Sequence, residues 1–151
     1  MEMVHIAPAA TEERFSCRRG GLTIRGRMFR SGEGVLPAVI ICHGFMANQR
    51  SVRRYARFLA GLGWAAFTFD FCGGCLRGES DGKQSEMSVL TEIEDLRAVM
   101  EYIKQRDDVD AGHLSLMGCS QGGVVCALTA AKAPEEVERL ILFYPAFCIP
   151  D

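Results

Sequence analysis

The sequence contains no apolar run long enough to cross a membrane. Its first residues also lack the basic segment followed by an apolar segment that marks a secretory signal. Positive charge is not concentrated either, because 17 Lys and Arg residues are offset by 19 Asp and Glu residues and the net charge is −2. These absences give no reason to expect a membrane or nucleic-acid partner, and they favour a cytoplasmic protein.

Groups of metal-ligating residues are also missing. The sequence holds seven cysteines, yet only Cys72 and Cys75 are spaced as a pair, within Cys-Gly-Gly-Cys. A structural zinc site needs a second pair of ligands. A redox pair opens a helix, whereas glycines surround this one. We therefore expect an ordinary loop with reduced thiols, and no metal.

What the sequence does contain is a regular alternation of apolar runs and helical periodicity. The hydrophobic share of 48% suits one core, in a single domain spanning residues 1–151. Gly20-Gly21 is a hairpin signal near the start. The predicted elements are strands at 13–18, 22–29, 38–42, 65–69, 113–117 and 140–144, and helices at 52–62, 89–103 and 121–132. This order indicates an α/β fold with a mostly parallel sheet and helices on both faces.

Charged residues of the predicted helices are expected to lie away from the core. In the helix at 89–103 an apolar stripe occupies one face, and Glu92 and Asp95 are placed elsewhere on the helix. The densest group of basic residues has helical spacing and is interpreted as a solvated face; it consists of Arg50, Arg53, Arg54 and Arg57.

The motif Gly-x-Ser-x-Gly occupies residues 118–122, between a predicted strand and a predicted helix. That context is the one a nucleophile elbow requires. Side chains at Gly118 and Gly122 would collide with neighbouring backbone in so tight a turn. The turn would lift the Ser120 hydroxyl above the sheet edge and aim the Gln121 N–H, at the start of the helix, toward an oxyanion. We interpret Ser120 as a candidate nucleophile and Gln121 as a candidate oxyanion donor.

A second segment supports this interpretation from a distant part of the chain. His43-Gly44-Phe45 directly follows the predicted strand at 38–42. In a fold of this kind the loop after that strand supplies the other oxyanion N–H, for which Phe45 is the candidate. The triad order on this fold is serine, then acid, then histidine, so His43 is placed too early to be the base. We expect His43 and Gly44 to shape the oxyanion loop.

Three further stretches narrow the interpretation: Phe69-Asp70-Phe71, Gly78-Glu79-Ser80-Asp81-Gly82-Lys83, and residues 87–95. Together with residues 43–45 and 119–125 they resemble the bacterial feruloyl (cinnamoyl) esterases of the α/β-hydrolase superfamily. The resemblance runs from about residue 22 to the end of the chain, and it departs from the family at residues 72–77 and at Cys119. It implies a serine hydrolase that acts on a small-molecule carboxylic ester without any cofactor.

One part of this chemistry is missing from the sequence. A serine hydroxyl needs a base, and the base needs a carboxylate to orient it. No histidine follows Ser120, since the three histidines are His5, His43 and His113. The later acids do not end a predicted strand; they are Glu135, Glu136, Glu138 and Asp151.

The resemblance implies that the acid, the base and a lid come after the sixth strand. We therefore expect the chain to be the N-terminal part of an α/β-hydrolase domain, truncated after that strand, with the lid and the C-terminal strands absent and esterase activity impaired. It is either a fragment or a short protein that completes its sheet as a homo-oligomer through the exposed edge. In the second case the chain would be a non-catalytic binding or assembly module. A peptidase or a thioesterase also stays open.

Overall fold

The computed structural model describes residues 9–148, so His5 and Asp151 lie outside the described residues. Its strands are β1 (Thr11–Arg19), β2 (Leu22–Arg30), β3 (Leu36–Cys42), β4 (Ala65–Phe69), β5 (Val109–Cys119) and β6 (Leu140–Phe143). Its α-helices are α1 (Arg53–Gly61), α2 (Val89–Lys104) and α3 (Gln121–Lys132). Short 3-10 turns are η1 (Gln49–Val52), η2 (Gln84–Glu86) and η3 (Pro134–Glu136). No helix in this described part is long and apolar enough to cross a membrane.

The strands form one sheet in the order β1-β2-β4-β3-β5-β6. The four strands β4, β3, β5 and β6 are parallel, and the hairpin β1–β2 joins them through an antiparallel pairing of β2 with β4. Gly20 supplies the positive φ, 56°, that the hairpin turn needs. The predicted α/β fold with a mostly parallel sheet is therefore confirmed.

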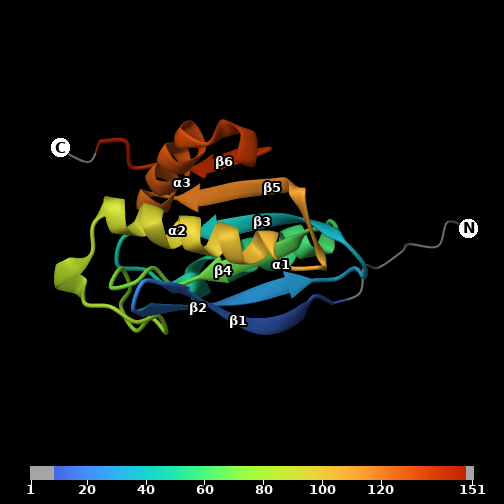
Figure 1. Ribbon diagram of the computed structural model, residues 1–151, viewed down its shortest axis with the longest axis horizontal. Helices are drawn as coiled ribbons and strands as arrows, with labels where there is room; N and C mark the ends of the chain where they lie inside the picture. Colours follow the sequence, from blue (N-terminus) through green and yellow to red (C-terminus); the bar gives the residue numbers. More distant parts are fainter. Residues whose placement is uncertain (1–8, 149–151) are drawn as a thin grey trace, which may run out of the picture.

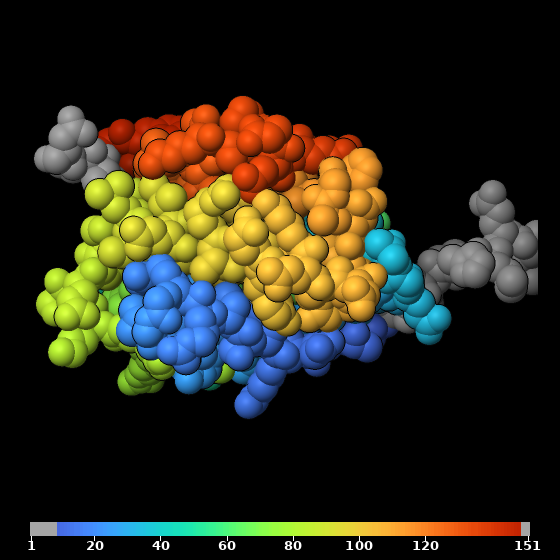
Figure 2. Space-filling view, in the orientation of Figure 1, coloured from blue at the N-terminus to red at the C-terminus, as the bar shows by residue number. Residues whose placement is uncertain are grey.

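Helices cover both faces of the sheet (Figure 1). Alternate residues of β3 point to opposite sides, as the pleat requires. On one side Ile40 packs in the cluster that contains the apolar stripe of α2. On the other side Ile41 packs in the cluster that contains Ala56 of α1. In Figure 2 helix α2 fills the space between the β1–β2 hairpin and α3.

Helix α2 differs from its sequence interpretation in one respect. A capping box formed by Ser88 and Thr91 starts the helix, and the predicted apolar stripe is buried. However, Glu92 and Asp95 are buried too, with exposed fractions of 2% and 0%. Asp95 accepts hydrogen bonds from the Arg19 side chain and from the Cys72 N–H. The buried face of α2 is thus wider than the predicted stripe, since it extends to Val99 and takes in both carboxylates.

Strand β5 begins earlier than predicted, at Val109 rather than His113. Val109 pairs with Leu36, but the register with β3 then shifts and skips residues 111–113. This irregular segment, Ala-Gly-His, is exposed and contains no large apolar residue, so it carries no strand signal in the sequence. His113 lies within it, at the amino half of the strand and far along β5 from Ser120.

Candidate active site

The candidate site lies at the carboxyl ends of three neighbouring parallel strands. His43 follows β3, Asp70 follows β4, and Ser120 follows β5. In open α/β sheets this edge is where ligands bind. The topology therefore brings together residues that are up to 77 positions apart in the sequence.

Ser120 occupies a strained turn between β5 and α3. Its backbone has φ 53° and ψ −120°. Residues other than glycine rarely adopt this conformation, because it costs them about 1–3 kcal/mol. Neighbouring backbone holds it there: the Ser120 N–H donates to the Phe143 carbonyl (3.0 Å), and the Ser120 carbonyl accepts from the Ala146 N–H (3.1 Å). The hydroxyl of Ser120 makes no hydrogen bond within residues 9–148.

Two glycines allow this turn because nothing larger fits. A Cβ at Gly118 would lie 2.4 Å from the Gly122 carbonyl oxygen, and a Cβ at Gly122 would lie 2.4 Å from the His43 carbonyl oxygen. Gly44 is also adjacent to the serine, since a Cβ there would lie 3.3 Å from Ser120 Cβ. All four positions that were predicted to shape the loops thus lie in contact around Ser120.

The backbone amides that were predicted as oxyanion donors are free. Neither the Phe45 N–H nor the Gln121 N–H meets an acceptor in the part of the chain that the structure describes. Gln121 begins α3, so its amide lies at the positive end of the helix dipole. The Phe45 side chain is exposed, and Phe45 directly follows Gly44, which lies against Ser120.

His43 is engaged away from Ser120. Its Nε2 accepts a hydrogen bond from the Phe71 N–H (3.2 Å) and lies 3.0 Å from Cys75 Sγ. This arrangement assigns the proton to Nδ1, which donates to the Gly44 carbonyl (2.8 Å). Burial lowers the pKa of His43, so the ring is neutral. Both ring nitrogens are thus occupied by groups other than Ser120, and the role of His43 in shaping the oxyanion loop stays a prediction.

Asp70 is a structural residue that the sequence analysis named only within the stretch Phe69-Asp70-Phe71, without giving it a role. Its carboxylate accepts from the Gln49 N–H (2.8 Å), the Gln49 side-chain amide (3.0 Å) and the Glu79 N–H (2.8 Å). It thereby ties η1 to the loop between β4 and α2. Its position directly after a buried strand was the available signal.

The ligand atoms of His43, Asp70 and Cys75 lie within 4.8 Å of one another, which is close enough to consider a metal ion. The Asp70 oxygens are already taken by N–H donors, and so is His43 Nε2. The cluster is therefore satisfied by hydrogen bonds as it stands.

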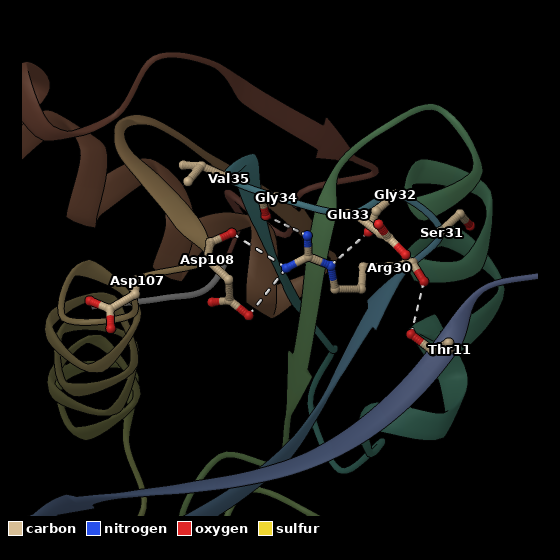
Figure 3. Close-up of a pocket in the computed structure, with 9 residues that line it drawn as sticks. All are labelled: Thr11, Arg30, Ser31, Gly32, Glu33, Gly34, Val35, Asp107 and Asp108. Carbon is tan, nitrogen blue, oxygen red and sulfur yellow. Dashed lines mark hydrogen bonds and ion pairs between the residues drawn. The ribbon is translucent and has the colours of Figure 1, made fainter.

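A cavity of about 170 Å³ opens over Ser120. Its lining includes Gly44, Ser51, Arg54, Tyr55, Cys119 and Tyr144. A larger cavity of about 560 Å³ lies at the opposite edge of the sheet, by the start of β3 (Figure 3). There the Arg30 guanidinium is fully engaged with the Gly32 carbonyl (2.9 Å), the Gly34 carbonyl (2.6 Å) and Asp108 (3.1 Å). The smaller cavity is the one that contains reactive groups.

The described residues place no base beside the serine. His113 is exposed and pairs with Glu138 (3.0 Å). Glu136 pairs with Arg97 (3.1 Å) and with Lys104. Among residues 9–148, therefore, the candidate nucleophile Ser120 has no histidine or carboxylate as its hydrogen-bond partner.

Comparison with known proteins agrees with this geometry. The family model described as "Serine aminopeptidase, S33" matches residues 35–151. Mouse palmitoyl-protein thioesterase ABHD10, mitochondrial, is 32% identical over 111 residues, which are 72% of this chain and 34% of the relative. Bis(hydroxyethyl) terephthalate hydrolase of Streptomyces coelicolor is 31% identical over 119 residues, 76% of this chain and 34% of that protein. The chain thus spans about a third of the length of these curated relatives.

Solved structures give the same assignment. Est1E from Butyrivibrio proteoclasticus, with bound ferulic acid, superposes with a TM-score of 0.80 at 26% identity, over 90% of this chain and 54% of that one. DcsB in complex with its substrate analogue gives 0.79 at 28% identity, over 89% of this chain and 45% of that one. Since the family model covers most of the chain, the protein belongs to the serine aminopeptidase S33 family of α/β-hydrolases.

Proposed function

We propose that this protein is a serine hydrolase of carboxylic esters and that Ser120 is its nucleophile. The observation that carries the proposal is the strained Ser120 turn, with Gly44 of the predicted oxyanion loop against it and the unpaired N–H of Gln121 next in the chain. A strained residue at the end of a parallel strand persists only where the surrounding structure imposes it. The contacts of Gly118 and Gly122 impose it here.

In this mechanism the Ser120 oxygen attacks the ester carbonyl carbon, and negative charge develops on the carbonyl oxygen. The N–H groups of Phe45 and Gln121 donate to that oxygen, and the dipole of α3 adds to the stabilisation. Removal of one such donor from a serine hydrolase lowers kcat by roughly 10²–10³-fold. The alcohol leaves, and water then hydrolyses the acyl-serine.

A base must take the proton of Ser120 in the first step and return it to the alcohol. We place this histidine and its orienting acid outside the described residues, on another segment or another subunit. The 151 residues alone should therefore turn over esters weakly, because an oxyanion hole and a serine retain only residual catalysis.

For the substrate we propose small esters, with hydroxycinnamate esters as the first class to test. Support comes from the sequence resemblance and from the likeness to Est1E, which was solved with ferulic acid. A thioester is the second candidate, because the mouse relative is named as a thioesterase. We keep a cytoplasmic location as a prediction from the sequence.

The test compares the wild-type chain with Ser120→Ala, using p-nitrophenyl acetate, methyl ferulate and an acyl thioester. We expect slow release of product that disappears in Ser120→Ala, and equally slow covalent labelling of Ser120 by a fluorophosphonate, because no base among the described residues activates the hydroxyl. Rapid Ser120-dependent turnover would instead mean that the base is supplied within these residues or by a second copy. Product release that persists in Ser120→Ala would show that Ser120 is not the nucleophile.

The second candidate function is a non-catalytic module whose sheet is completed by another copy of the chain. Strand β6 pairs with β5 alone within residues 9–148, and Leu140 and Phe143 on it are exposed. An apolar cavity of about 370 Å³ lies beside this edge, between α1 and β6. Open strand edges and apolar patches favour association. A Ser120 that no fluorophosphonate labels, in a stable oligomer, would favour this function.

A further inference from the structure

The cavity over Ser120 contains one charged side chain. Of the nine residues that line it, only Arg54 carries a charge. One guanidinium N–H of Arg54 donates to the Tyr55 hydroxyl (2.9 Å), and no carboxylate lies within ion-pair distance among residues 9–148. A guanidinium has five N–H donors, so most of them face the cavity or solvent unpaired.

The helix that carries Arg54 has charge of one sign. The continuous segment Gln49–Gly61, which comprises η1 and α1, contains four arginines and no Asp or Glu. Arg50 and Arg53 also lack an ion pair in the described part of the chain, and Arg57 reaches Glu12 only at 3.8 Å. This segment therefore adds a positive field to the local charge of Arg54, and a cleft lined by one sign of charge concentrates ligands of the opposite sign.

Arg54 keeps its charge at every accessible pH. Its pKa lies above the ordinary value, chiefly because the Tyr55 hydroxyl accepts a hydrogen bond from it. A planar guanidinium binds a carboxylate through two parallel hydrogen bonds, which a lysine cannot reproduce. Ser51 and Tyr144 line the same cavity; the Ser51 hydroxyl donates to the Asn48 carbonyl (2.7 Å), so Tyr144 is the further candidate donor to an anion.

We propose that Arg54 forms an anion subsite beside Ser120, and that the preferred substrates are esters whose short acyl chain ends in a carboxylate. This inference rests on the proposed function of Ser120. The cavity volume of about 170 Å³ limits the chain length.

The test uses two ethyl esters of equal acyl length. Ethyl butyrate ends in a methyl group, and monoethyl succinate ends in a carboxylate. The measured quantity is the succinate-to-butyrate ratio of acylation rates at Ser120, followed by ethanol release and by intact mass. In Arg54→Gln we expect this ratio to fall about tenfold, the size of one charge-assisted contact. Arg54→Lys should recover part of the loss.

The matched control is Arg50→Gln, which removes the same charge from the same segment without touching the cavity. Its ratio should stay within about twofold of the wild type, since exposed charges at a distance are screened by salt. If the ratio falls equally in both variants, the effect comes from the overall positive charge of the segment, and the Arg54 subsite is overturned. A ratio unchanged in Arg54→Gln would overturn the subsite.

A second measurement separates this inference from the function of Ser120. Succinate is titrated into ¹⁵N-labelled protein, and the amide shifts of Gly44 and Ser120 are followed in wild type, Arg54→Gln and Arg50→Gln. Arg54-dependent shifts without any acylation would support the subsite and reject the esterase. Acylation by butyrate without Arg54-dependent succinate shifts would support the esterase and reject the subsite.

Discussion

The side-chain amide of Gln121 donates a hydrogen bond to the carboxyl group of Glu92, across 29 positions of sequence. Glu92 is almost fully buried on α2, and Gln121 directly follows Ser120 at the start of α3. The other oxygen of Glu92 faces Gly74, where a Cβ would approach it to 2.9 Å. A titratable group therefore holds the residue whose backbone amide is the candidate oxyanion donor.

The first prediction concerns the pH dependence that Glu92 gives to stability. Burial, with a smaller contribution from Asp95, raises the pKa of Glu92 from 4.5 to about 7, against the opposing effect of the bond from Gln121. The folded protein therefore favours the neutral acid. Its contribution to stability is complete below about pH 4.5 and is lost as the pH rises through about 7. At about 1.4 kcal/mol per pKa unit, this amounts to roughly 3 kcal/mol.

Glu92→Gln should remove that contribution to the pH dependence, because glutamine stays neutral. We expect the unfolding free energy of the wild type, measured in urea, to fall between about pH 4.5 and about pH 8 by more than that of the variant. Glu94→Gln is the matched control, since Glu94 is exposed on the same helix. Parallel profiles for wild type and Glu92→Gln would show that Glu92 does not titrate in this range.

The second prediction concerns the glycine beneath the serine turn. Gly122→Ala would bring a methyl group to 2.4 Å from the His43 carbonyl oxygen and 2.5 Å from that of Cys42. Neither backbone atom can move without displacing β3, so we expect a loss of about 1–3 kcal/mol in unfolding free energy. The rate of fluorophosphonate labelling at Ser120 should also fall, even under conditions in which the Gly122→Ala variant is still fully folded.

The control for this substitution is Gly61→Ala at the end of α1, where a Cβ meets nothing within 4 Å. Alanine there should leave stability unchanged or raise it by up to about 1 kcal/mol, because it favours the helix. If Gly122→Ala behaved like Gly61→Ala in urea unfolding, the contact between the two loops would be looser than the structure has it.

The fold could be predicted from the sequence because its strongest signals are local. The run at Ala38–Cys42 is apolar throughout because β3 is buried on both faces. The Ser120 turn could also be predicted from the sequence, since its geometry depends on glycines two positions away. The burial of Glu92 was missed, because the buried face of α2 is wider than the predicted stripe and the partner Gln121 lies on another helix. The register shift before Leu114 was hidden for the same reason, since it depends on pairing with β3.

The third prediction concerns the order in which two histidines titrate. Burial lowers the pKa of His43 below its ordinary value of 6.5, whereas Glu138, followed by Asp110, raises that of His113. At about pH 6.5 His113 should therefore be mostly protonated and His43 mostly neutral. Imidazole ¹⁵N spectra recorded across the pH range measure both, with His5→Asn used to identify the third signal.

Glu138→Gln is the variant that checks the cause. It should lower the pKa of His113 and leave that of His43 in place, because Glu138 contacts only the former ring. The spectra should also show the proton of His43 on Nδ1. A protonated Nε2, or a His43 that titrates above His113, would contradict the hydrogen bond from the Phe71 N–H and reopen His43 as a base.

The fourth prediction concerns the open edge of the sheet. Leu140 lies on β6 and Leu128 on α3, and their exposed fractions, 39% and 41%, are nearly equal. If copies of the chain associate through β6, Leu140→Lys should weaken the association by at least about tenfold, since a charge on an edge strand opposes pairing. Leu128→Lys adds the same charge elsewhere and should leave it unchanged. Sedimentation velocity over a range of protein concentrations measures both, and a wild-type chain that stays monomeric throughout would leave the esterase as the sole candidate.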